Sequence, residues 1–325
     1  MKAPANSADS VPLDKNNQKV FEDELKHPPP PPQPVPRMQL IPQPDFQASF
    51  QRDGVEVARN WFSPSLHRPF IFPVIGPSGR SLTRMGSPHE PQSHSHHNSV
   101  WVGHNDVDGT DFWTDGVDTG RIVHQTIERL TDGEDAASCS MVSAWTRNSD
   151  AVLLTERRLI MVKALANNEL MLTIDLQLEP RAASVTFGKT PYGLIGVRMA
   201  KTIGVTDGGG TIRNSEGGVD EPNVFWKRAK WVDYAGPITN KAEEGITLMD
   251  HPENPNYPTF FHVRRDGWMG SSLTLDSART VTREKPLRMR YGLYVHNGIP
   301  ALKVIEERWE EFAREPLPDL VLKPK

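Results

Sequence analysis

Four histidines lie within the twelve-residue stretch SHSHHNSVWVGH at 93–104, at positions 94, 96, 97 and 104. Imidazole titrates near neutral pH, and either ring nitrogen can bind a metal ion. The stretch therefore offers two kinds of chemistry, proton transfer or coordination of a divalent metal. In an extended chain His94 and His96 point to one side and His97 to the other, so only some of these rings can meet.

Histidines are concentrated in this part of the chain. Six of the eleven fall between 89 and 124, namely His89, His94, His96, His97, His104 and His124. Zinc or a similar divalent metal needs three or four such ligands, and we consider His96 and His97 with His251 or His104. Nearby aspartates could instead favour calcium, but their spacing is not that of an EF-hand loop.

Proton transfer needs an acid and a base on opposite sides of a substrate. We expect His97 or His124 to be the acid and Glu156 or Asp250 to be the base, with His251 as a further catalytic candidate. Glu156 lies inside a strand-like run, LLTERRL, where a charged residue either faces solvent, forms a salt bridge or acts in function. Each of these alternatives stays open.

A second dense polar segment, MDHPENPNYPTFFHVR, covers 249–264. Its prolines fix backbone angles and so could position polar side chains, although a plain proline-rich turn between strands has the same pattern. Indole and phenol rings offer flat faces to a sugar ring, and amide and guanidinium groups can position it. The expected substrate-binding residues are Trp101, His104, Asn105, Arg198, Trp231, Tyr234, Asn254 and His262.

Short runs of β-branched, aromatic and aliphatic residues supply the elements that would hold these side chains. Asp53-Gly54 between FQASFQ and VEVARNWF predicts a tight hairpin. The stretch 121–187 predicts an antiparallel meander of long strands, and 204–223, rich in glycine, predicts a loop or flexible hairpin. Further strands are expected between 229 and 296, and one helix, ALKVIEERWEEFARE, follows Pro300.

So many antiparallel strands need two large sheets packed face to face. We predict an all-β fold, a large antiparallel β-supersandwich with a C-terminal helix, over 45–325 as a single domain. Residues 1–44, with HPPPPPQPVP, predict a disordered proline-rich segment, which is a spacer or a ligand for an SH3-like partner. The single cysteine, Cys139, lies in a strand-like stretch and is expected to be a buried thiol.

Composition narrows the range of partners. A net charge of -4 and a pI near 6.3 give no general attraction for nucleic acid or anionic membranes. No stretch approaches the roughly 20 apolar residues that span a bilayer, and no secretory signal is visible. We expect a cytoplasmic protein whose partner is a small-molecule carbohydrate, with an unknown oligomeric state.

Taken in order, several motifs resemble a bacterial family, the PmoA-like family of unknown function. The motifs are HSHHNSVWVGHNDVDGTDFW, GRIVH, TERR, TPYGLIGVRMA, WVDYAG, MDHPENPNYPTFFHVR and YGLYVHNG. The resemblance implies a galactose-mutarotase-like supersandwich, as in aldose epimerases and several polysaccharide lyases and hydrolases. The methane oxygenase label attached to that family does not fit, because the membrane-bound oxygenase needs transmembrane helices.

The first hypothesis is a carbohydrate-active enzyme of the epimerase, lyase or hydrolase type that transfers protons between histidine, carboxylate and sugar. In a variant, a divalent metal on His96, His97 and His251 polarises a carbonyl or hydroxyl group. The second hypothesis is a non-catalytic carbohydrate-binding module, and the third is a metal-dependent oxygenase accessory. Fold analogy alone does not decide among them.

Overall fold

The computed structural model describes residues 14–15, 18–19, 32, 34–87, 89–90, 92, 94–147 and 151–321. The chain divides into two compact units, 1–35 and 36–325, and all strands and helices below belong to the second. Most of the predicted disordered segment 1–44, with much of its proline tract, lies outside the described residues. Strand β1 begins before the predicted boundary at 45, because Met38 and Leu40 pack into the core.

The larger of two main sheets has nine strands. In spatial order they are β1 Met38–Gln43, β2 Gln47–Arg52, β3 Val55–Trp61, β4 Phe70–Val74, β5 Val100–His104, β11 Gly193–Arg198, β17 Trp268–Ser272, β16 Phe260–Arg264 and β13 Lys227–Arg228. The predicted hairpin is confirmed as β2 and β3. Its turn residues Asp53 and Gly54 have φ angles of 52° and 76°, as a two-residue hairpin turn requires.

The second main sheet has eight strands. In spatial order they are β12 Thr211–Asn214, β14 Trp231–Thr239, β15 Ala242–Asp250, β19 Leu287–Asn297, β9 Leu170–Pro180, β8 Ala151–Ala164, β7 Ala136–Arg147 and β6 Arg121–Thr131. The predicted meander is confirmed, since β6 to β9 are consecutive neighbours. Strand β10 Ser184–Phe187 leaves this sheet and pairs with β18 Arg279–Thr282.

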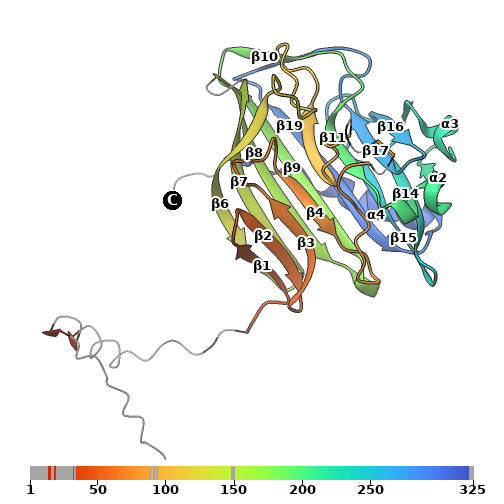
Figure 1. Cartoon of the computed structure of the whole chain (residues 1–325), viewed down its shortest axis with the longest axis horizontal. Helices are drawn as coiled ribbons and strands as arrows, with labels where there is room; N and C mark the ends of the chain where they lie inside the picture. Colours follow the sequence, from red (N-terminus) through yellow and green to blue (C-terminus); the bar gives the residue numbers. More distant parts are fainter. Residues whose placement is uncertain are drawn as a thin grey trace, which may run out of the picture. The chain divides into compact units, whose positions relative to one another are not determined.

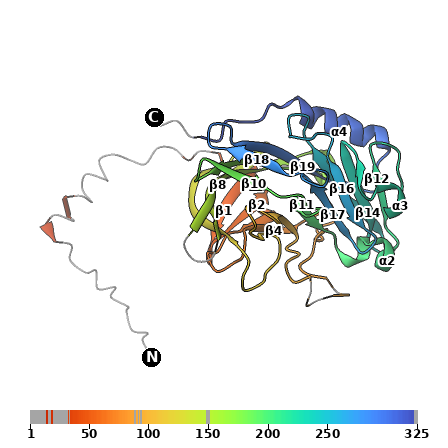
Figure 2. The same cartoon turned by 90° about the horizontal axis from the view of Figure 1, so that it is seen from above.

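The two main sheets pack face to face, as Figures 1 and 2 show. Alternate residues of both sheets, such as Val102, Val197, Leu248 and Leu293, form one core between them. The prediction of an antiparallel β-sandwich with a C-terminal helix is therefore confirmed. The stretch 204–223 is more ordered than predicted, because it contains β12 and two short helices, α2 Val205–Gly208 and α3 Glu221–Val224.

The C-terminal helix α4, Leu302–Arg314, lies on the outer side of the eight-stranded sheet (Figure 2). Its residues Ile305 and Phe312 pack with Trp231, Met249 and Tyr294, which point away from the main core. The remaining helical turns are η1 Ala166–Asn168 and η2 Lys201–Ile203. In the described part of the chain, α4 is the longest helix, and none has the length and hydrophobicity of a bilayer-spanning segment.

The only thiol of the chain, Cys139, is buried in the main core on β7. Burial raises the pKa of this thiol to about 12, although the positive charge of Arg158 acts in the opposite direction. The prediction of a buried thiol is confirmed.

Candidate functional site

The nine-stranded sheet uses only one of its faces in the main core. Val100 and Val102 of β5 point into that core, so Trp101 between them lies on the opposite, outer face. The same alternation places Arg198 of β11 and Trp268 of β17 on the outer face. This face carries the candidate site.

Strand register fixes two rows of side chains on the outer face. In the first row Trp101 pairs with Gly196, Gly196 with Gly270, and Gly270 with His262. A Cβ atom at Gly196 would lie 2.5 Å from Cη2 of Trp268 and 2.8 Å from Cζ2 of Trp101. Glycine is needed here because both indole rings approach this position too closely for a side chain.

The second row consists of Arg198, Trp268 and Arg264 on the neighbouring strands β11, β17 and β16. Trp268 also belongs to a separate aromatic cluster with Trp101 and Trp113. The ring centroids of these three indoles are 5.2 to 5.7 Å apart. The outer face thus has a rigid aromatic floor with a guanidinium group on each side of one indole.

The histidine-rich segment lies over this floor. The imidazole of His97 stacks on Trp268 at 5.1 Å and on Trp101 at 5.3 Å between centroids, and it contacts the rings of His94 and His96. His97 therefore joins the histidine segment to the aromatic floor.

The buried guanidinium of Arg68 holds the histidine segment in place. It donates to the carbonyl oxygen of His96 (3.3 Å), to Oδ1 of Asn98 (2.9 Å) and to the carbonyl oxygen of Thr114 (2.7 Å), and it forms an ion pair with Asp115. These bonds tie the histidine segment to the loop after Phe112. Arg68 acts as a positioning residue.

The floor and the surrounding loops enclose a cleft of about 300 Å³. Its lining residues are His94, His96, His97, Asn105, Trp113, Thr114, Tyr192, Arg198, His262, Arg264, Asp266 and Trp268. Among the predicted site residues, the cleft brings together His96, His97, Asn105, Arg198 and His262. Trp101 lies in the aromatic cluster beneath His97.

The buried imidazoles of the cleft are neutral at pH 7. Burial, followed by the nearby charges of His96 and Arg198, lowers the pKa of His97 to about 2. Burial and Arg68 lower the pKa of His96 to about 4, and burial and Arg264 lower that of His262 to about 4. Each ring therefore offers one donor and one acceptor nitrogen.

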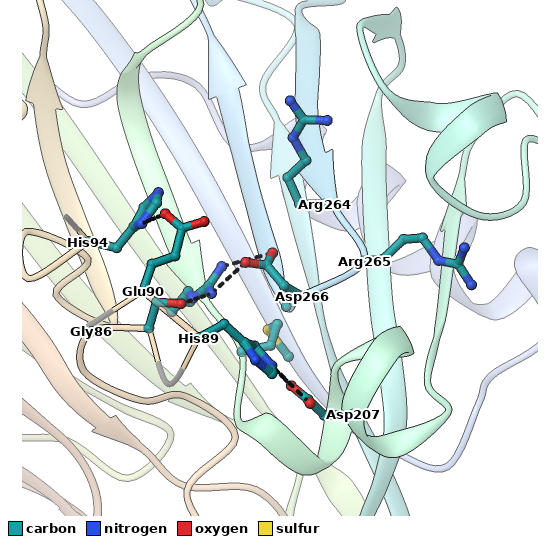
Figure 3. Close-up of polar contacts among 12 residues, drawn as sticks. Gly86, His89, Glu90, His94, Asp207, Arg264, Arg265 and Asp266 are labelled. Atoms are coloured by element: carbon teal, nitrogen blue, oxygen red, sulfur yellow. Dashed lines mark hydrogen bonds and ion pairs between the residues drawn. The ribbon is translucent and has the colours of Figure 1, made fainter. Parts of the chain in front are cut away.

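The carboxylate of the cleft, Asp266, is paired with Arg198. Nη1 and Nη2 of Arg198 donate to the two carboxylate oxygens at 3.1 and 2.8 Å. Burial acts to raise the pKa of Asp266, but Arg198 and Arg84 outweigh it and the pKa lies below its ordinary value. Figure 3 shows Asp266 facing the loop that carries Gly86 and His89.

Several buried polar atoms around the cleft have no hydrogen bond of good geometry to any described residue. They are Nδ1 of His97, both ring nitrogens of His262, Nε1 of Trp101 and Nε of Arg198. An unsatisfied buried polar atom costs about 1–3 kcal/mol, and each such atom in a native structure calls for a partner. A polar ligand in the cleft would supply hydrogen-bond partners for these atoms.

Other predicted residues lie elsewhere. His104 is buried at the end of β5, where Nε2 donates to Oγ1 of Thr274 at 2.8 Å. His124 packs against Phe62 between the two sheets. Glu156 is fully buried in the main core, where it accepts from Nε1 of Trp145 (2.8 Å) and Nε of Arg158 (2.7 Å).

The second dense polar segment forms a structural cluster near α4. Asp250 accepts from Nδ2 of Asn254 (2.7 Å) and from the backbone of Thr259 (2.9 Å), and Asn254 also bonds the backbone of Arg290. Nε2 of His251 donates to the carbonyl oxygen of Glu315. We call Asp250, His251, Asn254 and Thr259 the Asp250 cluster, and none of them lines the cleft.

Two predicted aromatic residues have structural partners. Trp231 lies under α4, where Nε1 donates to Glu306. The hydroxyl of Tyr234 accepts from the backbone of Gly267 (3.1 Å) and reaches the carbonyl oxygen of Arg265 at 3.0 Å. Tyr234 thus fixes the turn that carries Asp266, and so it positions a cleft residue without lining the cleft.

The predicted metal ligands His96, His97 and His251 do not meet, because His251 packs against Phe312 of α4. Within the described ranges, no group of three or more histidine, cysteine, aspartate or glutamate side chains is arranged to hold a metal ion.

Several residues that line the cleft were not predicted from the sequence. They are Thr114, Tyr192, Arg264, Asp266 and Trp268. One signal was present, since Arg264 follows His262 at the two-residue spacing of one strand face. The contribution of Trp268 depends on the pairing of β11 with β17, which are distant in sequence.

Comparison with known proteins gives a family and distant structural neighbours. The pattern of DUF6807, a family of unknown function, matches residues 47–310. No curated protein matches the chain. None of the comparisons supports the PmoA-like name.

Three solved structures are similar to the chain. A protein described as a putative mutarotase (YeaD) from Salmonella typhimurium has 10% identity and a TM-score of 0.41, over 86% of this chain and all of that one. A GalM/aldose epimerase homologue from C. elegans has 7% identity and a TM-score of 0.33, over 81% and 99%. A putative kojibiose phosphorylase from the human microbiome has 10% identity and a TM-score of 0.33, over 88% and 38%.

Proposed function

The chain belongs to the DUF6807 family, and we propose that its cleft binds a small carbohydrate and catalyses proton transfer on the bound sugar. A cleft of about 300 Å³ has the size expected for a small ligand. Trp113 and Trp268 are only 2% and 5% exposed, and His97 stacks on Trp268, so the aromatic contact to the C–H surface of a sugar ring is best supplied by Tyr192, which lines the cleft and is 39% exposed. Asn105 and Thr114, which line the same cleft, suit its hydroxyl groups.

One observation carries the proposal, namely the state of His262. This imidazole is buried, lines the cleft and is neutral at pH 7; the backbone of Pro191 is near enough to act to raise its pKa, but neither ring nitrogen has a hydrogen bond of good geometry within the described residues. Its unprotonated nitrogen can take a proton from a sugar hydroxyl or C–H group. The imidazolium then returns the proton to an oxygen of the same sugar, and Nε of Arg198 stabilises the negative charge that develops.

The state of His97 changes the role expected for it. With a pKa of about 2, His97 is not an imidazolium at pH 7 and cannot act as a general acid, whereas the neutral ring can still donate and accept one hydrogen bond. Stacked on Trp101 and Trp268, it is also held rigidly, which suits positioning of a sugar hydroxyl.

A non-catalytic carbohydrate-binding module is the second candidate. It is favoured by Asp266, because both oxygens of this carboxylate already accept from Arg198. Without a free carboxylate in its lining, the cleft lacks the histidine and carboxylate pair expected from the sequence. Metal assistance and a cytoplasmic location stay predictions.

The test is incubation of the protein with monosaccharides, disaccharides and 3-keto sugars in heavy water, followed by NMR. We expect C–H exchange or bond cleavage, and His262→Gln should lower the rate by about 10²–10⁴-fold. His124→Gln is the matched control, since it removes an imidazole outside the cleft and should keep the rate. Binding without reaction favours the module, and absence of any sugar binding contradicts both candidates.

A further inference from the structure

The charged groups of the cleft indicate which sugars it selects. Arg198 and Arg264 flank the indole of Trp268 in one row across three strands. Among the described residues that line the cleft, Asp266 is the one acidic side chain. Asp266 pairs with Arg198 and Glu221 pairs with Arg264, so the selectivity of the cleft depends on the donor nitrogens that these two guanidinium groups leave unused.

Arg264 has a large unused capacity for hydrogen bonding. Its Nη1 donates to Glu221 at 2.9 Å, and its guanidinium stacks on Phe225 at 4.3 Å, while Nε and Nη2 donate to no described residue. The side chain is 48% exposed, so an arriving ligand can reach it. The stacking holds the planar group in one orientation, which favours recognition of a planar or tetrahedral anion.

Arg198 adds a second unmet donor. Its Nε is buried and has no partner among the described residues, although Nη1 and Nη2 are occupied. A guanidinium nitrogen can only donate. Nε of Arg198 therefore requires an acceptor from the ligand, the exposed donors of Arg264 can exchange water for one, and an anionic group offers more acceptor atoms than a neutral hydroxyl.

We propose that the cleft selects monosaccharides that carry an anionic group, a carboxylate or a phosphate, with the anion at Arg264 and the sugar ring beside Tyr192, whose ring lines the cleft and is 39% exposed. This inference rests on the proposed function, because it names the substrate class of the same cleft. Nε of Arg198 then donates to an oxygen of the sugar ring or of a substituent.

The experiment compares glucose, glucuronate and glucose 6-phosphate by isothermal titration calorimetry with the full chain. We expect at least one anionic sugar to bind about tenfold more tightly than glucose, as one additional charge-assisted hydrogen bond provides. The preference should weaken at high salt. The two anionic sugars distinguish a carboxylate from a phosphate.

A matched pair of variants locates the anion. Arg264→Gln should abolish the preference while glucose still binds, whereas Arg265→Gln removes the same charge from the next residue and should keep the preference. Figure 3 shows that the two side chains point in different directions. Circular dichroism of both variants confirms that the fold is intact.

Each outcome separates the inference from the proposed function. Equal or tighter binding of glucose overturns the anionic preference and leaves carbohydrate binding intact. Loss of the preference in Arg265→Gln as well assigns it to general charge and overturns the role of Arg264. Binding of none of the three sugars overturns the inference, and failure across the whole sugar panel overturns the proposed function too.

Discussion

Buried polar atoms without a partner in the described part of the chain occur in the eight-stranded sheet as well as at the cleft, for example Nη2 of Arg158 and Oγ of Ser143, but two of the sheet's buried carboxylates differ from the polar groups of the cleft. In the eight-stranded sheet, both oxygens of Glu156 and both oxygens of Asp250 accept hydrogen bonds from protein groups. At the cleft, His262 and Arg198 keep buried nitrogens without a partner among the described residues. Paired groups stabilise the fold, whereas unpaired groups beside a cavity are available to a ligand.

The comparison shows that a high density of polar residues does not identify a site. The Asp250 cluster is as polar in sequence as the histidine-rich segment, yet its hydrogen bonds join a loop to β19 and to the segment after α4. Burial raises the pKa of Asp250 to about 7, although three hydrogen bonds act to lower it. The raised pKa of Asp250 results from its burial. Because Asp250 does not line the cleft, the shift does not indicate a catalytic role.

The largest effect should come from Glu156→Gln. The change leaves the charge of Arg158 uncompensated in the core, so we expect the free energy of unfolding to fall by about 3–5 kcal/mol. Turnover per folded molecule should not change. Glu128→Gln is the control, because its ion pair with Arg157 is partly exposed and should contribute only about 0–1 kcal/mol. Urea unfolding measures the stability of both variants. Loss of turnover in a Glu156→Gln protein that remains folded would show that Glu156 takes part in the reaction.

A pair of asparagine variants tests the comparison directly. Asn254→Ala removes three hydrogen bonds from the Asp250 cluster and should lower the free energy of unfolding by about 2–4 kcal/mol, without changing sugar affinity. Asn105→Ala in the cleft should do the opposite, weakening sugar binding at nearly unchanged stability. The same effect on stability from both variants would contradict the distinction between the two regions.

Gly196→Ala tests the aromatic floor. Because its Cβ would overlap the rings of Trp268 and Trp101, we expect a loss of about 1–3 kcal/mol in the free energy of unfolding and weaker sugar binding. Tryptophan fluorescence should report the displaced indoles. Wild-type stability and fluorescence in this variant would show that the rings do not rest on Gly196.

Apart from the effects of single substitutions, stability should depend on pH. The folded pKa values of His96, His97 and His262 lie below the ordinary value of 6.5, so their contribution to stability is present above pH 6.5 and is lost as the pH falls toward 4. Each imidazole contributes up to about 1.4 kcal/mol per pH unit in this window.

Asp250 opposes this trend, because its raised pKa makes its contribution disappear as the pH rises through about 7. Urea unfolding at several pH values measures the net slope. His97→Gln should flatten the slope below pH 6.5, and an unchanged slope would contradict burial of a neutral His97.

Local patterns predicted most of the elements. The Asp53-Gly54 turn and the apolar spacing of Ile305 and Phe312 each depend on neighbouring residues, so the sequence alone was sufficient for the first hairpin and for α4. In 204–223, glycine content suggested a loop, but Ile212 and Val224 anchor short elements in the core.

The cleft was predicted only in part. Clustering in the sequence was enough to select His96 and His97. Trp268 and Asp266 line the cleft only because the strand order β5, β11, β17, β16 places strands from three distant segments side by side. The sequence did indicate the structural role of Glu156. Arg158 lies two residues away on the same strand face, and the two side chains form an ion pair.

The single thiol of the chain offers a direct measure of how often the sandwich opens. Cys139 lies in the shared interior of both sheets, so an alkylating reagent can react with it only in molecules whose sheets have separated. The labelling rate therefore reports native-state opening without any engineered probe. A ligand that occupies the outer cleft should slow this labelling by the factor with which it stabilises the folded chain.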